Sequence, residues 1–253
     1  MTATNDGGLD RMNALAKLLL EDENYFQFPN LRPKDAATLI LLDRSGRVPK
    51  VLLGKRHHGH KFMPGKFVFP GGGLEPGDRR MGVARPLHPQ AQARLMQRVR
   101  RPSPAHARAL ALAAIRETGE ETGLLLGTCR DHAGTAAGAW AAFAQAGILP
   151  DLGAIHFIGR AITPPRRARR FDARFFTMDA STIAHRLDGV IGPDAELVEL
   201  VWMPLAEARA LDMATVTGVM LEELDARIAA GLGHDLSVPF YRMDHRHFVR
   251  ELL

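Results

Sequence analysis

The stretch RETGEETGL (residues 116–124) lies near the middle of the chain, and FVFPGGGLEPGD (residues 67–78) precedes it. Ala- and Leu-rich sequence predicts a helix over residues 105–121, and Gly123 is a typical helix stop. The earlier stretch predicts a short strand that ends at a proline and three glycines. Together the two stretches predict a strand, a glycine turn and an acidic helix.

The acidic residues of this helix share one face. At 100° per residue, Glu117, Glu120 and Glu121 fall within a sector of about 100°. Three carboxylates on one face repel one another, and a divalent cation would remove that repulsion. Arg116 precedes Glu120 by four residues and is placed to orient one carboxylate. A solvated acidic helix end paired with nearby arginines is the alternative that the helix alone leaves open.

With the glycine turn included, the sequence resembles the Nudix hydrolase family. The family's box reads G-x5-E-x7-R-E-U-x-E-E-x-G-U, where U is aliphatic. Gly72 stands at the first glycine, Asp78 stands where Glu is usual, and Thr118 stands at an aliphatic position. The second half of the box matches at Arg116, Glu117, Glu120, Glu121, Gly123 and Leu124.

The spacing departs from the family pattern. Thirty-seven residues separate Asp78 from Arg116, where the box has seven. Residues 79–104 carry seven arginines and no acidic residue, and we interpret them as an insertion into the box. The resemblance covers roughly residues 35–210 and implies a Nudix-type α/β/α sandwich with a mixed central sheet.

We expect residues 1–253 to form a single domain of this α/β class, because no Gly/Ser-rich or Pro-rich linker divides the chain. Its core would span about 35–210, with the insertion at 79–104 and a helical C-terminal extension over residues 211–253.

The resemblance also implies a reaction, the hydrolysis of a diphosphate bond in a nucleoside diphosphate linked to another group. Mg²⁺ or Mn²⁺ would be held by Glu117, Glu120 and Glu121. By the family pattern, Arg116 and Asp78 would orient the ligands. The general base stays open among Glu120, Glu121, Glu196 and Glu199.

Substrate contacts are expected from Arg56, Gly72, Arg170 and Arg174, because guanidinium forks bind phosphate oxygens in pairs and glycine allows close approach. Residues 162–165 and 169–176 resemble most closely the Nudix branch that contains the peroxisomal coenzyme A diphosphatase. Coenzyme A or acyl-coenzyme A is therefore a candidate substrate.

Two other functions stay open. One is a Nudix-fold regulator that binds nucleic acid through residues 79–104, although the intact glutamate set favours a small-molecule substrate over nucleic acid. The other is an isopentenyl diphosphate isomerase, which needs a catalytic cysteine. Cys129 is the only cysteine of the 253 residues, and no matching motif surrounds it.

The composition excludes other classes of protein. With 46% hydrophobic and 24% charged residues, the chain has ordinary globular composition, and a single cysteine excludes a disulfide scaffold. No signal peptide or membrane-spanning run is visible, so we expect a cytoplasmic protein without membrane contact. A homodimer is an option that the resemblance raises.

Overall fold

The computed structural model describes residues 6–22, 27–59, 63–130 and 136–253. Strand β1 (Lys34–Asp43) lies at the centre of the main sheet. Its apolar run is buried on both faces, because Leu39 and Leu41 pack on one side while Ile40 and Leu42 pack on the other. The strand is therefore the core of a layered structure.

Within the described residues, nine strands form this sheet. The order along it is β11-β2-β1-β9-β8-β12-β13, with β3 paired to β2 and β4 paired to β1. β1 and β9 are parallel, as are β8 and β12, while the remaining neighbours are antiparallel. The sheet is thus mixed. Its strands other than β1 are β2 (Lys50–Arg56), β3 (Phe67–Val68), β4 (Gly71–Gly73), β8 (His156–Ile162), β9 (Phe171–Asp179), β11 (Leu197–Pro204), β12 (Pro239–Asp244) and β13 (His247–Leu252).

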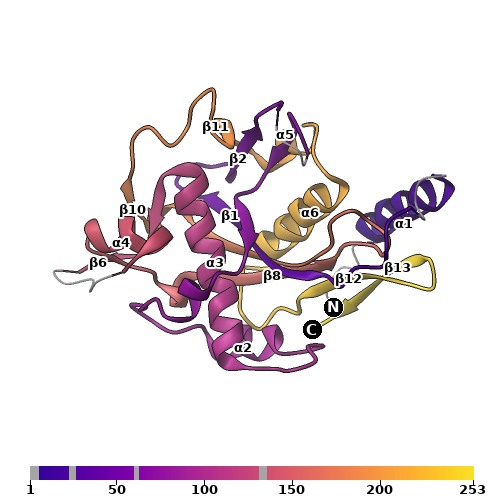
Figure 1. Cartoon of the computed structure of the whole chain (residues 1–253), viewed down its shortest axis with the longest axis horizontal. Helices are drawn as coiled ribbons and strands as arrows, with labels where there is room; N and C mark the ends of the chain where they lie inside the picture. Colours follow the sequence, from indigo (N-terminus) through magenta and orange to yellow (C-terminus); the bar gives the residue numbers. More distant parts are fainter. Residues whose placement is uncertain (1–5, 23–26, 60–62, 131–135) are drawn as a thin grey trace.

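Helices cover both faces of the sheet. In Figure 1, α3 (Pro104–Thr122) lies over β1, and α6 (Thr215–Ala229) lies near β8. The core on the α3 face also includes α2 (Pro89–Leu95) and α4 (Ala141–Gln145). The core on the α6 face includes α1 (Asp6–Glu21) and α5 (Leu205–Ala208). This arrangement confirms the predicted α/β/α sandwich with a mixed sheet.

Short elements complete the described parts of the chain. Two strand pairs lie outside the main sheet, β5 (Leu124–Leu126) with β10 (Ile183–Arg186) and β6 (Thr128–Cys129) with β7 (Ile148–Leu149). The 3-10 turns are η2 (Pro76–Arg79), η3 (Gly138–Trp140), η4 (Leu152–Ala154) and η5 (Ala180–Thr182). Within the described ranges, no helix combines the length and the apolar character that crossing a bilayer requires.

The segment between the two halves of the box packs against the body of the protein. Four of its apolar side chains are buried in the core on the α3 face, namely Met81, Leu87, Ala91 and Leu95. Arg85 forms an ion pair with Asp151 at 2.6 Å. The 37-residue spacing is therefore accommodated by a packed segment containing α2, and the two halves of the box remain together.

The prediction of a helical C-terminal extension over residues 211–253 is wrong for its last part. After α6, strands β12 and β13 form a hairpin that extends the main sheet beside β8. His245 and Arg246 make the turn with φ of 42° and 75°. Such values are uncommon for non-glycine residues. Because His and Arg stand where Asn-Gly or Asp-Gly usually marks a hairpin, the sequence gives no signal for this turn.

Candidate active site

Helix α3 carries the acidic residues, and its ends are well defined. The Ser103 side chain accepts a hydrogen bond from the His106 N–H at the N-terminus, where Pro104 occupies the first turn. Gly123 ends the helix with φ of 73°, a left-handed conformation that favours glycine. The predicted boundaries are therefore correct to within one residue.

Local contacts of the helix explain two positions of the acidic stretch. Thr118 is fully buried, and its hydroxyl donates to the Ala114 carbonyl at 2.8 Å, so a polar side chain is satisfied at an aliphatic position of the box. A Cβ at Gly119 would lie 3.0 Å from the Phe143 ring and 3.2 Å from Leu125. The helix therefore sits tightly on its neighbours, which fixes the direction of the glutamates.

Arg116 joins the two halves of the box. Its Nε donates to Asp78 Oδ1 at 2.9 Å, and its Nη2 donates to the Gly73 carbonyl at 2.7 Å. Asp78 is fully buried and also accepts from Trp140 Nε1 at 3.1 Å. Although Asp is one methylene shorter than the usual Glu, it reaches Arg116 across 38 positions of sequence. The ion pair locks the glycine turn to the helix.

The same guanidinium also holds two glutamates. Arg116 Nη1 lies 2.9 Å from Glu117 Oε1 and 2.6 Å from Glu120 Oε2. Burial alone would lower the pKa of Arg116, but Asp78, Glu117 and Glu120 raise it, so the side chain stays charged. Arg116 therefore contacts both carboxylates, in the position from which the sequence predicts that it orients them.

The glycine turn brings the backbone against the glutamates. A Cβ at Gly72 would lie 2.4 Å from Glu117 Oε1, so only glycine leaves room for that carboxylate. A backbone hydrogen bond from Gly71 reaches Glu121. The turn thus forms one wall of the acidic site.

Two of the glutamates are strained electrostatically. Burial raises the pKa of Glu117 to about 7, against the opposing effect of Arg116. Burial raises the pKa of Glu121 well above its ordinary value, and Glu196 and Glu117 add repulsion. Oε2 of Glu121 is buried and makes no hydrogen bond within the described part of the chain. The site therefore has more negative charge than its arginines neutralise.

A distant segment contributes a fourth acidic residue. Glu196 lies just before β11, where its carbonyl accepts from the His57 N–H at 3.1 Å and its carboxylate pairs with Arg56 at 3.0 Å. Its charge acts on both Glu117 and Glu121. Arg56 is also close enough to lower the pKa of Glu121. Residues from the start of β11 and the end of β2 thus complete the site.

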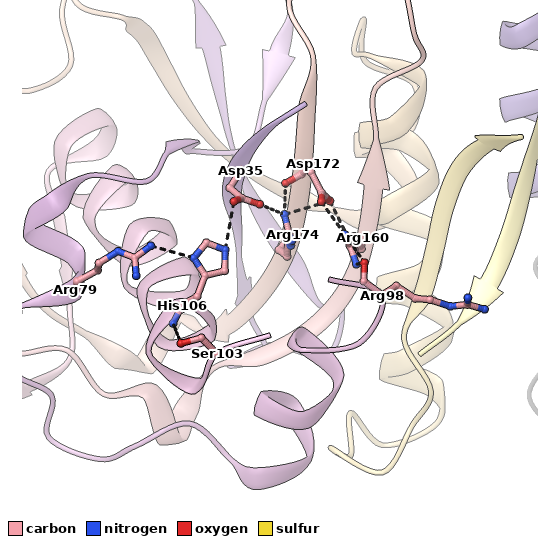
Figure 2. Close-up of polar contacts among 8 residues, drawn as sticks. All are labelled: Asp35, Arg79, Arg98, Ser103, His106, Arg160, Asp172 and Arg174. Atoms are coloured by element: carbon pink, nitrogen blue, oxygen red, sulfur yellow. Dashed lines mark hydrogen bonds and ion pairs between the residues drawn. The ribbon is translucent and has the colours of Figure 1, made fainter. Parts of the chain in front are cut away.

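The structure does not bring Arg170 and Arg174 to these glutamates. Arg174 is almost fully buried and donates to Asp35 at 2.6 Å, at the other end of α3 (Figure 2). Asp35 also meets His106, which lies about 16 Å from Glu117 along the helix at 1.5 Å per residue. Arg170 donates to Asn30 and to the carbonyls of Leu31 and Thr163. The substrate contacts predicted for these two arginines have no support in their placement.

Similarity to known proteins agrees with this geometry. A solved Nudix hydrolase from Alicyclobacillus acidocaldarius is 30% identical over 76% of this chain and 90% of that protein, with a TM-score of 0.56. The chain belongs to the Nudix hydrolase family. It is accordingly an enzyme of the class that acts on diphosphate bonds.

Further solved Nudix structures match at lower similarity. The NUDIX domain of Shewanella oneidensis NrtR, complexed with ADP ribose, is 15% identical over 84% of this chain and 97% of that protein, with a TM-score of 0.44. A C. elegans Ap4A hydrolase is 14% identical over 78% of this chain and 99% of that protein, with a TM-score of 0.40. At these values neither tells us about the substrate of this Nudix hydrolase. No protein-family model and no curated protein matches the chain.

The side chains of this Nudix site fit a hard divalent cation. Carboxylate oxygens are the ligands that Mg²⁺ and Mn²⁺ prefer, and the buried Glu121 Oε2 accepts no hydrogen bond from any described residue. The described residues do not already form a closed cage of three or more acidic, histidine or cysteine ligands. Glu117 and Glu120 instead share the Arg116 guanidinium, at 2.9 and 2.6 Å from its Nη1.

Two residues considered from the sequence lie elsewhere. Glu199 is on β11 opposite Lys55 and is exposed. Cys129 is exposed on β6, opposite Ile148. The sequence left Glu196 and Glu199 equal as candidates, and it missed Trp140 as a donor to Asp78. The in-and-out alternation of side chains along a strand could not show which of the two glutamates faces the site, because Glu196 precedes β11 and only Glu199 lies on it.

Proposed function

We propose that this Nudix hydrolase is a Mg²⁺- or Mn²⁺-dependent diphosphatase that cleaves a nucleoside diphosphate linked to another group. The observation that carries the proposal is the meeting of Glu117, Glu120, Glu121 and Glu196 beside the glycine turn, with the pKa of two of them raised by burial and mutual repulsion. A divalent cation would offset that repulsion and attract the substrate's diphosphate.

The roles of the residues follow from their positions. Glu117, Glu120 and Glu121 would hold the cation, which supplies neutralisation of phosphate charge and a more acidic water. Arg116, held by Asp78, would keep the carboxylates of Glu117 and Glu120 in place. Gly72 leaves space for Glu117 at the wall of the site. We assign no phosphate contact to Arg170 or Arg174.

Glu196 is the stronger of the two distant candidates for the general base. Its side chain is exposed but is held by Arg56 at 3.0 Å, and its charge acts on Glu117 and Glu121. A base must lie within reach of the water that it deprotonates, and Glu199, on β11 opposite Lys55, is not among the main charges that act on the site's glutamates. Glu120 and Glu121 remain alternatives, because each also lies at the site.

The substrate class is tested with a panel of diphosphates. Phosphate or nucleotide release is measured with Mg²⁺ or Mn²⁺ for coenzyme A, acyl-coenzyme A, ADP-ribose, NADH, diadenosine polyphosphates and nucleoside triphosphates. We expect turnover of at least one of them and its loss in Glu120→Gln. Coenzyme A enters only as one member of the panel, since two arginines of the stretch that resembles its branch have structural partners.

A binding measurement separates the metal from the chemistry. We expect Mg²⁺ to raise the melting temperature of the wild-type protein, since an ion bound only by the folded state stabilises it by about 2.7 kcal/mol at one hundred times its Kd. The Glu117→Gln and Glu120→Gln variants should lose most of that shift. A folded protein that neither gains stability from Mg²⁺ or Mn²⁺ nor cleaves any diphosphate would contradict the proposal.

A further inference from the structure

Positive charge is gathered in three connecting segments at one end of the sheet. They are residues 27–34, which lead into β1, residues 97–103 between α2 and α3, and residues 163–170 between β8 and β9. Together they hold nine of the 33 basic residues and none of the 28 acidic ones. The rest of the chain, with 24 basic and 28 acidic residues, is net acidic. We call these three segments the basic end.

Hydrogen bonds place two of the segments side by side. The Lys34 N–H donates to the Arg170 carbonyl at 2.9 Å, where β1 and β9 begin in parallel register. The Arg170 guanidinium donates to Asn30 Oδ1 at 2.7 Å and to the Leu31 carbonyl at 2.6 Å. The chain entering β1 therefore lies against the loop between β8 and β9.

Figure 2 shows how the third segment joins them. Arg160, on β8, donates to the Arg98 carbonyl at 3.4 Å and to Asp172 at 2.7 Å. It also donates to the Gln97 carbonyl at 3.1 Å. His106, at the start of α3, lies 3.2 Å from Asp35, next to Lys34. The connection between α2 and α3 is thus fixed beside the other two segments.

The acidic residues that border the basic end are already paired. Asp35 and Asp172 bind Arg174, and Asp172 also binds Arg160. Glu251 binds Arg98 at 3.2 Å and Arg242 at 2.5 Å. Among the described residues, no acidic side chain forms an ion pair with five cations of the basic end, namely Arg32, Lys34, Arg100, Arg101 and Arg167. Four of these five are exposed, and Arg167 is partly exposed.

This surface differs from the catalytic site in what it can bind. Its nearest point on α3 is the N-cap Ser103, about 21 Å from Glu117 at 1.5 Å per residue, so it is not the wall that receives the scissile diphosphate. Five cations on adjacent segments call for several phosphates, and guanidinium groups match phosphate oxygens with paired hydrogen bonds. Phe28, in the first segment, is 42% exposed and offers a ring on which a base can stack.

We propose that the basic end binds single-stranded nucleic acid, with its arginines on the phosphates and Phe28 against a base. This goes beyond the proposed diphosphatase activity and does not rest on it. It also revises the expectation that nucleic acid is not a partner. Of residues 79–104, where the sequence located such a role, Arg85 is paired with Asp151 and Arg94 binds backbone carbonyls. The exposed arginines 100 and 101 contribute instead.

The test is fluorescence anisotropy of the full chain with a labelled single-stranded RNA of about 20 nucleotides. Affinity should fall as salt rises, with a slope of about −0.7 per phosphate contact in a plot of log K against log salt. Arg100→Glu combined with Arg101→Glu should weaken binding at least about tenfold and flatten the slope by about one or more. Phe28→Ala should weaken it about fivefold or more.

The matched control is Arg47→Glu combined with Lys50→Glu. These exposed residues lie at the opposite end of β1, about 30 Å from Lys34, and change the net charge equally. We expect the control to bind almost as well as the wild type, and both double variants to keep their melting temperatures. The proposal is overturned if the wild type does not bind at low salt or if the control loses as much affinity. Preference for a duplex of equal length, or binding only to vesicles containing phosphatidylserine, would overturn it as well.

Discussion

Helix α3 has an ionic centre near each end, and each is built around a buried arginine that pairs with carboxylates. Toward its C-terminus, the buried Arg116 meets Asp78, Glu117 and Glu120. Near its N-terminus, the equally buried Arg174 meets Asp35 and Asp172, which also pair with His106 and Arg160. The first centre has more carboxylates than cations, while the second is balanced.

The carboxylate pKa values reflect this difference. The pKa of Glu117 is raised to about 7, chiefly by burial, whereas that of Asp35 is lowered to about 2, chiefly by its hydrogen bond with His106. A balanced network stabilises the fold without a ligand, while an acidic excess costs stability until a cation arrives. Both centres contain a buried arginine, so that feature does not separate them. The direction in which the carboxylate pKa is shifted distinguishes the structural centre from the candidate functional one.

The largest effect is expected from breaking the balanced centre. Arg174→Met should destabilise the protein by about 3 kcal/mol, because it removes a buried cation and leaves the half-buried Asp35 and Asp172 with less compensation. Urea unfolding followed by circular dichroism measures this change. The kcat and KM of the folded enzyme should stay within about twofold of wild type. A raised KM at unchanged stability would instead indicate that Arg174 contacts the substrate, and the two centres would then not differ in function.

In the acidic centre we expect a substitution to lower activity and to leave stability unchanged. Glu121→Gln should lower kcat/KM about 100-fold or more, a change of about 2.7 kcal/mol in transition-state stabilisation. It should not lower the melting temperature in metal-free buffer, because the amide removes a buried charge that Glu117 and Glu196 repel. Steady-state kinetics and a thermal melt provide the two readouts. A destabilised but active variant would show that Glu121 is structural.

The sequence was sufficient for the parts of this site that depend on local pattern. Helical spacing placed Glu117, Glu120 and Glu121 on one face, and glycine at position 72 predicted the close turn. The Arg116–Asp78 contact was predicted across the long insertion only through the resemblance to the family box. Local rules alone do not specify a partner 38 positions away.

The features that sequence missed depend on long-range partners. Arg174 and Asp35 are 139 positions apart, so a motif containing Arg174 could not show that its charge is already used. The hairpin of β12 and β13 was missed because its turn residues give no turn signal. The insertion was identified by composition, but its packing depends on four apolar side chains that only the folded core brings together.

A third substitution tests how tightly the side chains of the acidic centre are packed around Asp78. Asp78→Glu restores the usual family residue, yet Asp78 is fully buried and already bonded to Arg116 and Trp140. The added methylene should cost about 1.5 kcal/mol through overpacking, with a several-fold loss of kcat as Arg116 shifts. Urea unfolding and kinetics measure the two effects. Full stability with raised activity would show that the site has room for the longer carboxylate.

The smallest effect concerns the pH dependence of the balanced centre. The pKa of Asp35 is about 2 in the folded protein, below its ordinary value of 3.8, so its contribution to stability is present above pH 4 and is lost as pH falls toward 2. Because the side chain is 38% exposed, solvent screening limits this contribution to about 1 kcal/mol.

Unfolding free energies of wild type and Asp35→Asn at pH 6, 4 and 3 isolate that contribution, because the other carboxylates titrate in both proteins. The gap between the two proteins should be largest at pH 6 and should narrow toward pH 3. A gap that widens as pH falls would mean that the folded state raises the Asp35 pKa. The N-terminal centre would then resemble the acidic one, and the contrast between the two ends of α3 would fail.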